Sequence, residues 1–286
     1  MFYVVKYLYG LLAQLYADHA DPRVKDWPLL YEPLLPLTII SLYLLFVLKY
    51  GPKWMEKRHP FELKNVMRLY NAIQVIVNFY IFASAIPNSY AHKNFSFRCQ
   101  PPTPTNTEPW MMRCLQLTYG YYLTKYLDLF DTIFIVLRKK SQQVTFLHVY
   151  HHAGMVFGVY VYMTFLPCSH STMLGIVNLL VHTVMYAYYF IASVRPTTAT
   201  IWWKKHITQM QLLQFAYLTF HFLQVVVNNT CGHPFLIAMV GFIQNIFMFA
   251  LFFDFYYRTY MKKDNKAKKV EERRTITKDE TKIKSS

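Results

Sequence analysis

Three histidines lie within five residues in the segment 148-HVYHH-152, inside an otherwise apolar stretch. His148, His151 and His152 are spaced i, i+3 and i+4, so a helix places all three on one face. Imidazoles in this arrangement suit metal binding, nucleophilic or acid–base catalysis, or polar packing between helices. The residues around them along the chain discriminate among these interpretations.

A second apolar stretch carries charged residues in the segment 125-KYLDLFDT-132. Lys125, Asp128 and Thr132 share a helix face, and Asp131 is adjacent to it. Ionisable groups inside membrane segments are costly to bury and mark functional sites. The alternative is an internal ion pair that joins helices.

Uncharged polar residues and a fourth histidine occur in three further apolar stretches. They are Asn71, Gln74 and Asn78, then Asn178 and His182, then Gln211 and Gln214.

These stretches belong to a chain of 286 residues that is 54% hydrophobic. Runs of about 20 apolar residues are typical of transmembrane helices. We therefore predict an all-α polytopic membrane protein with seven transmembrane helices. The predicted spans are roughly residues 33–49, 66–86, 114–137, 144–167, 171–192, 205–227 and 234–257.

The net charge of +15 is concentrated in alternate loops and in the C-terminal tail. This positive-inside pattern argues against a nucleic-acid partner, and it predicts a cytosolic C-terminus with the N-terminus on the opposite side. We divide the chain into an N-terminal lumenal segment (1–30), a transmembrane catalytic domain (31–260) and a basic cytosolic tail (261–286). Residues 1–16 are predicted as an interfacial helix, with a signal peptide as the alternative.

With this topology, the polar groups of four spans lie at similar depths from the cytosolic end. A rise of 1.5 Å per residue gives about 12 Å for His151, 14 Å for Asp128, 15 Å for Gln214 and 16 Å for His182. Scattered packing residues have no reason to coincide, so we predict one buried polar site. Basic residues above it suit a phosphate-bearing substrate, although the positive-inside rule alone also explains them. They are Arg138, Lys139, Lys204 and Lys205.

All four cysteines fall on the lumenal side in this topology, which permits a disulfide and leaves no thiolate for a cytosolic substrate. Cys99 and Cys231 lie in flexible segments, whereas Cys114 begins a span and Cys168 lies in a tight turn. We therefore predict a Cys99–Cys231 disulfide. Two sequons, at Asn94 and Asn228, also face the lumen; either can be idle, and Asn228 is close to the membrane.

Of the 11 histidines, we expect only His148, His151, His152 and His182 to gather, because the others lie in loops, at span ends or in a lumenal half-span. Four imidazoles can hold one zinc ion. The many further ligands of an iron-dependent lipid oxidase or hydroxylase are not present. A seven-helix transporter remains a further alternative.

The four polar segments together resemble the very-long-chain fatty acid elongase family, the membrane 3-ketoacyl-CoA synthases. HVYHH is similar to the histidine box of that family, and the segments 125–132, 178–189 and 208–215 are similar to its other motifs, in the same order. The resemblance covers about residues 30–286. At Asp128 the family often has glutamate, which makes the role of this residue less certain than that of Asp131.

The resemblance implies six helices around an acyl tunnel that opens to the cytosol. It implies condensation of a long-chain acyl-CoA with malonyl-CoA as co-substrate, without a cofactor. The implied setting is the endoplasmic reticulum membrane, and a dilysine signal at Lys282 and Lys284 agrees with it. Membrane lipids, the reductase and dehydratase of the elongation cycle, and a second copy of the chain are the expected partners.

The resemblance also implies roles for individual residues. His151 is the expected acyl-accepting nucleophile, because neutral imidazole attacks thioesters. His182 activates the malonyl unit, and His148 and His152 orient the reacting groups. Asp128 or Asp131 fixes a tautomer and Lys125 balances their charge. The expected substrate-binding residues are Asn178, Tyr186, Tyr189, Gln211, Gln214, Lys204, Lys205, Arg138 and Lys139.

Overall fold

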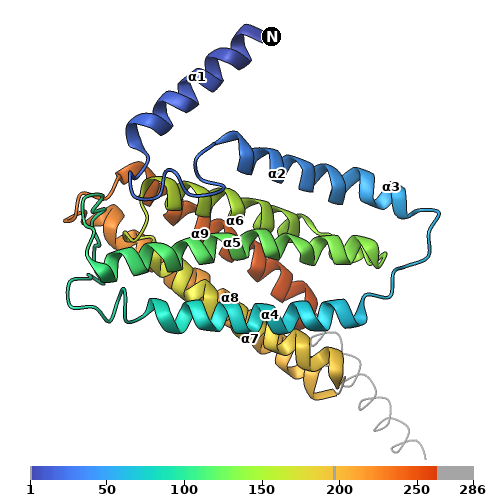
Figure 1. Ribbon diagram of the computed structural model, residues 1–286. Coiled ribbons are helices and arrows are strands. Elements are labelled where there is room, and N and C mark those ends of the chain that lie inside the picture. The colour runs from blue at the N-terminus through green and yellow to red at the C-terminus, as the bar shows by residue number, and fades with distance from the viewer. Residues whose placement is uncertain (1, 196–197, 263–286) are drawn as a thin grey trace, which may run out of the picture.

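The structure is a computed structural model that describes residues 2–195 and 198–262, so Lys282 and Lys284 lie outside it. In the described ranges the long helices run side by side as an elongated bundle (Figure 1). The main helices are α4 Lys64–Ala85, α5 Pro109–Leu137, α6 Phe146–Phe165, α7 Thr172–Val194, α8 Thr198–Val227 and α9 Phe235–Tyr256. The last six predicted spans each fall largely on one of them.

The first predicted span ends too early. Helix α2, Leu34–Leu45, continues through a π-helical turn, Phe46–Tyr50, into α3, Gly51–Met55. Pro52 has no backbone N–H, so it cannot donate to the carbonyl one turn back. The wider turn just before it accommodates this loss, and the chain stays helical well past residue 49.

Packing contacts connect α4 to α9 in a continuous order. Helix α4 packs against α5 and α7, α7 against α8, α8 against α9, α9 against α6, and α6 against α5. Helix α2 lies against α6 on the outside of this set. The order of contacts therefore returns to α4, where it began.

Within the described residues, five helical stretches are long and apolar enough to cross a membrane, and the chain is a multi-pass membrane protein. They are Leu34–Met55, Lys64–Ala85, Thr172–Val194, Trp202–Val227 and Phe235–Met261. Helices α5 and α6 are not among them, although spans were predicted there. These two helices carry the charged residues and the histidine box, which lower their hydropathy.

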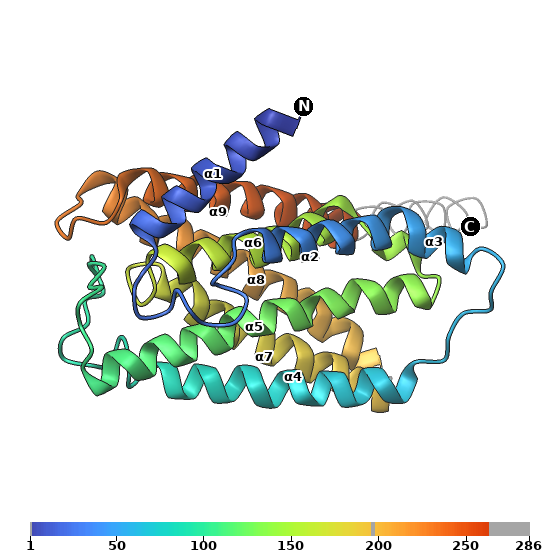
Figure 2. The same ribbon diagram turned by 45° about the horizontal axis from the view of Figure 1, so that its top comes forward.

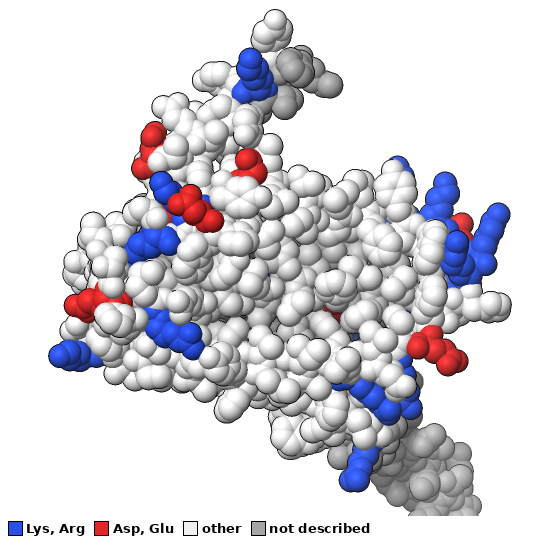
Figure 3. All heavy atoms as spheres, viewed as in Figure 1, with Lys and Arg blue, Asp and Glu red and all other residues white. Residues whose placement is uncertain are grey.

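Polar and apolar side chains are distributed in the sense opposite to that of a soluble protein. Gln74, Asn78 and Thr132 are fully buried, whereas Leu213 and Leu236 are 70% and 73% exposed. Figure 3 shows a face whose middle is almost free of charged side chains, which gather toward its ends. Apolar side chains therefore face the lipid, and hydrogen-bonding groups face one another inside.

Helix α1, Phe2–His19, projects away from the bundle in both ribbon views (Figures 1 and 2). The segment after it, residues 20–33, folds back over the end of the bundle. The backbone N–H of Asp21 donates to a carbonyl of α6 at 2.8 Å, and Val24 and Leu30 are fully buried. We call this the cap segment.

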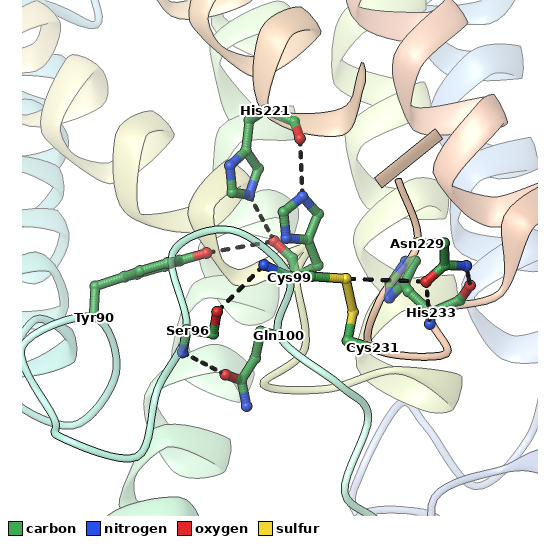
Figure 4. The surroundings of a disulfide bond; sticks show 9 residues. Tyr90, Ser96, Cys99, Gln100, His221, Asn229, Cys231 and His233 are labelled. Carbon is green, nitrogen blue, oxygen red and sulfur yellow. Dashed lines mark hydrogen bonds between the residues drawn. A yellow bond between two sulfur atoms is a disulfide. The ribbon is translucent and has the colours of Figure 1, made fainter. Parts of the chain in front are cut away.

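A disulfide joins Cys99 to Cys231 at the same end (Figure 4), the pairing expected from the sequence. We call this the disulfide end of the bundle. Its loops are 86–108, 166–171 and 228–234. The free cysteines, both buried, are Cys114 and Cys168.

The disulfide end also holds a second histidine cluster. His170, His221 and His233 come from three separate segments, and each is at most 2% exposed. The rings of His170 and His221 stack 3.8 Å apart, and each ring donates to the backbone carbonyl of the other residue, at 3.0 and 3.1 Å. The expectation that only the other four histidines gather was wrong, because positions along the sequence do not show which loops meet.

Candidate active site

A buried ion pair on α5 lies at the centre of the site. The Nζ atom of Lys125 is 2.7 Å from Oδ2 of Asp128, and both side chains are at most 5% exposed. Removing two charges from water costs several kcal/mol per ion unless each keeps good partners. The neighbouring helices supply those partners.

Asp128 accepts two further hydrogen bonds from neutral groups. Gln74 of α4 donates at 2.7 Å, and the hydroxyl of Tyr186 of α7 donates at 3.0 Å. Tyr186 also lies 2.6 Å from Asp131. Three helices thus converge on Asp128, which has more partners than Asp131.

His182 approaches the same carboxylate. Its Nδ1 atom is 3.5 Å from Oδ2 of Asp128, longer than a good hydrogen bond, and it has no other partner among the described residues. Its ring packs 5.6 Å from that of Tyr186. A small movement of the ring would complete the hydrogen bond, so Asp128 is placed to orient His182.

Asn178 lies on the other side of Lys125. Its Oδ1 atom accepts from Lys125 at 2.9 Å and from the hydroxyl of Tyr121 at 3.1 Å. Tyr121 also lines a cavity between α4, α5, α6 and α7, toward the disulfide end, whose lining is mostly apolar. The polar network therefore adjoins an apolar cavity.

Thr145 begins α6 and places the histidine box. Its side chain caps the helix by accepting the backbone N–H of His148 at 3.3 Å. The Nε2 atom of His148 is 2.9 Å from Oγ1 of Thr132 on α5, and Thr132 is 2.7 Å from the hydroxyl of Tyr43 on α2. A chain of hydroxyl groups therefore anchors this histidine to two neighbouring helices.

The other two histidines of the box remain uncommitted. The ring of His152 lies 4.4 Å from that of His148 and 5.7 Å from that of His151. His151 is half-buried between Phe215 of α8 and Phe252 of α9, at 6.4 and 6.1 Å. Neither His151 nor His152 makes a hydrogen bond through its ring to another described residue. An imidazole with a free lone pair is what a nucleophile requires.

Three of the predicted substrate-binding residues lie at the edge of this network. Tyr189 is 42% exposed, and Gln211 donates only to the sulfur of Met185, at 3.6 Å. Gln214 is buried, and its Oε1 atom has no hydrogen-bond partner within the described ranges. A buried acceptor in this state is suited to a donor supplied by substrate or water.

Four basic residues were predicted to lie above the polar site, at its cytosolic entrance, which we call the mouth. The structure places them in different ways. Arg138 lies 3.2 Å from the sulfur of Met67. Lys139 donates to two backbone carbonyls of the loop after α3, at 3.1 and 3.0 Å, and thereby ties that loop to the end of α5. Near the start of α8, Lys204 is exposed and Lys205 is half-buried. The exposed Lys204 is therefore better placed than Lys139 for a soluble phosphate group.

In the parts of the chain that the structure describes, no group of three or more His, Cys, Asp and Glu side chains has an arrangement suited to a metal ion.

Sequence reasoning included Tyr186 but missed three other tyrosine hydroxyls of the site, those of Tyr43, Tyr70 and Tyr121. Tyr70 accepts from Gln74 at 3.0 Å and lies 3.3 Å from the hydroxyl of Tyr186, and Tyr43 and Tyr121 make the contacts given above. Tyrosine counts as apolar in a hydropathy pattern, so these residues merge with the lipid-facing background. The sequence could have indicated them only through their spacing, which places them on the same helix faces as the polar residues.

The arrangement combines an uncommitted imidazole, a second imidazole beside a carboxylate, and a polar network that adjoins an apolar cavity through Tyr121. This combination suits transfer of an acyl group that carries a long apolar tail.

Comparison with known proteins gives consistent results. Residues 28–268 match the GNS1/SUR4 family. The chain is 37% identical over 252 residues to Very long chain fatty acid elongase 7 of Drosophila melanogaster, covering 88% of this chain and 76% of the relative. It is 39% identical over 246 residues to Very long chain fatty acid elongase 7 of Rattus norvegicus, with 85% and 86% covered. It is 34% identical over 254 residues to Very long chain fatty acid elongase 1 of Homo sapiens, with 88% and 90% covered.

Proposed function

Because the chain belongs to the GNS1/SUR4 family, we propose that it is a very-long-chain fatty acid elongase, a 3-ketoacyl-CoA synthase. It condenses an acyl-CoA with malonyl-CoA and releases CO2 and CoA. The observation that carries the proposal is the buried network of Lys125, Asp128 and His182; one helical turn further along α5, Thr132 holds His148 of the histidine box.

The proposed setting is the endoplasmic reticulum membrane, with the disulfide end in the lumen and the C-terminus in the cytosol. A disulfide at one end supports this orientation, because disulfides persist in the oxidising lumen. Lys282 and Lys284 would contribute retrieval to this compartment.

The proposed architecture is a barrel of α4 to α9 around an acyl tunnel. The continuous order of helix contacts supports it, as does the apolar cavity at the inner side of Asn178. The acyl chain would enter tail first from the cytosolic end, so that its thioester stops beside the histidine box.

In the first half-reaction, a ring nitrogen of His151 attacks the thioester carbonyl. The C–S bond breaks, the imidazole loses its ring proton to the departing thiolate, and CoA leaves as the thiol. His148 and His152 flank this step, and the ion pair of Lys125 and Asp128 keeps the surrounding polar groups oriented.

In the second half-reaction, malonyl-CoA occupies the vacated mouth and loses CO2. Its enolate attacks the acyl-imidazole, the C–N bond breaks, and the imidazole regains a proton from water. His182, which lies beside Asp128, and the side-chain amides of Asn178 and Gln214 are placed to stabilise the developing negative charge. No cofactor takes part beyond the co-substrate.

The mouth binds the two CoA groups in turn through their phosphates. Lys204 and Lys205 are the first candidates, and Arg138 is the next. Lys139 would first have to leave its two backbone carbonyls. The product retains a ketone, so a reductase and a dehydratase must act on it before another round, and these enzymes or a second copy of the chain are the expected partners.

The test is incubation of purified protein with acyl-CoA alone. We expect release of CoA and an acyl adduct on His151 by mass spectrometry, followed by labelled 3-ketoacyl-CoA when malonyl-CoA is added. Absence of both the adduct and early CoA release would rule out the two-step scheme. Loss of activity on chelation, or a requirement for oxygen, would favour the alternative of a metal-dependent lipid oxidase. Absence of any acyl-CoA-dependent product would favour a transporter.

A further inference from the structure

The two sequons of the chain lie at the disulfide end and differ in their surroundings. We infer that Asn94 carries an N-linked glycan and that Asn228 does not. The inference rests on the proposed membrane orientation and not on the proposed reaction.

The side chain of Asn94 is free to carry a large group. Asn94 is exposed, and its side-chain amide makes no hydrogen bond to another described residue. The next residue, Phe95, is 7% exposed and packs edge-on against Tyr90, with ring centroids 4.7 Å apart. Phe95 therefore anchors the loop while Asn94 stays at the surface, so a glycan would displace nothing from the core.

The folded loop nevertheless holds the rest of this sequon. The backbone N–H of Ser96 donates to Gln100 at 2.7 Å, and the hydroxyl of Ser96 accepts from the N–H of Cys99 at 3.3 Å (Figure 4). A transferase needs the Asn-X-Ser segment in an accessible form. The glycan must therefore be added before this loop closes.

Chain order leaves time for that addition. Cys99 cannot pair until Cys231, 132 residues later, has been made. At about 5–20 residues per second, synthesis of the intervening chain takes roughly 7–26 s. During this interval the loop that carries Asn94 lacks its covalent clamp.

Asn228 is also exposed, but it differs from Asn94 in its position on the chain and in the timing of loop closure. It follows the last residue of α8 directly, and its backbone N–H still donates to the carbonyl of Gln224 at 2.9 Å. Its neighbour Asn229 is bonded to the backbone of His233 at 2.6 and 3.1 Å. The disulfide partner of this loop is already present when the loop emerges, so closure follows without delay.

The modification balances without an oxidant or reductant. The side-chain amide nitrogen of Asn94 forms a bond to the anomeric carbon of a lipid-linked oligosaccharide pyrophosphate. The bond between that carbon and the pyrophosphate oxygen breaks, and the amide proton leaves with the lipid pyrophosphate.

The test is expression of the full chain in microsomes, followed by endoglycosidase H and gel mobility. We expect one mobility step for the unmodified sequence, for Asn228→Gln and for Ser96→Thr, which keeps the sequon. Asn94→Gln and Ser96→Ala should lose it. No step in the unmodified sequence, or a step that survives Asn94→Gln, would overturn the inference.

Elongation assays on the same samples separate this inference from the proposed function. Asn94→Gln should retain condensation activity while it loses the glycan. A glycosylated chain without activity would contradict the proposed function and leave the glycan in place, whereas an active chain without the glycan would contradict only the inference.

Discussion

The two histidine clusters of this bundle use the same side chain among different partners. At the active site, His148 and His182 lie beside a hydroxyl group and a carboxylate, and the other two imidazoles are uncommitted. At the disulfide end, His170 and His221 are bonded to each other's backbone carbonyls.

The partners decide what each imidazole can do. A ring that donates its N–H to a backbone carbonyl and stacks on a second imidazole, as His170 and His221 do, stabilises one conformation. A ring beside a carboxylate or with a free lone pair can gain or lose a proton or attack a carbonyl carbon. Clustering of histidines alone therefore does not identify a catalytic site, and adjacent charge is the better criterion.

Replacing one histidine from each cluster gives the sharpest contrast. His151→Ala should lower the condensation rate by roughly 10⁴-fold or more, as removal of a nucleophile does, while the protein stays folded. His182→Ala should have a comparable effect. His170→Ala should lower the melting temperature and leave the rate of the folded protein within a few-fold of the original, because it touches no reacting group.

The check is labelled malonyl-CoA incorporation, normalised to folded protein by size-exclusion chromatography. A His170→Ala protein that is folded and inactive would break the contrast.

The ion pair at the active site should show strong coupling. Asp128→Asn leaves the charge of Lys125 buried without its counter-ion, and losing one partner of a buried pair costs about 3–5 kcal/mol. Lys125→Met combined with Asp128→Leu should recover much of the stability but no activity. A double-mutant cycle by thermal unfolding in detergent measures the coupling, and additive losses would argue that the pair is not coupled.

Removing the disulfide should lower the stability of the protein and leave its condensation rate unchanged. Cys99→Ser, Cys231→Ser and the double variant should each lose about 2–4 kcal/mol, since one broken bond accounts for all three. Cys114→Ser is the matched control for loss of a free thiol. Non-reducing peptide mapping should first find Cys99 linked to Cys231, and a free thiol at either position would contradict the assignment.

The histidine cluster at the disulfide end should make this end sensitive to acid. Burial lowers the pKa of His233 from 6.5 to about 4, and burial also lowers the pKa of His170. The unfolded chain then takes up protons below about pH 6.5 that the folded chain refuses. Stability is complete above pH 6.5, falls as the pH drops toward 4, and levels off below it.

Melting temperatures measured from pH 7.5 to 4.5 check this expectation. His233→Leu should flatten the decline, whereas His59→Gln, an exposed histidine at the other end, should not. Equal slopes for all three proteins would assign the acid sensitivity to other groups. His221 is the third histidine of the cluster, and the aromatic groups that surround it are His170, Tyr90, Tyr217 and Phe222, none of which carries an acidic charge.

The smallest expected effect concerns the hydroxyl chain. Tyr43→Phe removes one hydrogen bond to Thr132, worth about 1 kcal/mol, or roughly five-fold in rate. Because Tyr43 acts through Thr132 and His148, the loss should fall on kcat and leave KM for acyl-CoA unchanged. Steady-state kinetics measure this, and an unchanged kcat would show that Thr132 alone positions His148.

The sequence predicted the helical segments and the polar layer because both depend on local spacing. Apolar runs locate helices, and depth along a helix follows from residue number, which is how Asp128 and His182 were placed together. Cys99 and Cys231 were paired from topology. Other contacts between loops were not predictable, because neither the meeting of His170 with His233 nor the attachment of Lys139 to the loop after α3 has a local signal.

The proposed tunnel has a kinetic consequence. If it closes toward the disulfide end, near which the cap segment packs on α5 and α6, an acyl chain that enters from the opposite end must leave by the path it took. Each round lengthens the departing chain by two carbons, and each buried methylene adds about 0.8 kcal/mol to its hold on an apolar tunnel. A one-ended tunnel would thus release its own product more slowly as the chain grows. The rate of product release, and with it the turnover rate, would then depend on how readily the surrounding lipid takes up the finished chain.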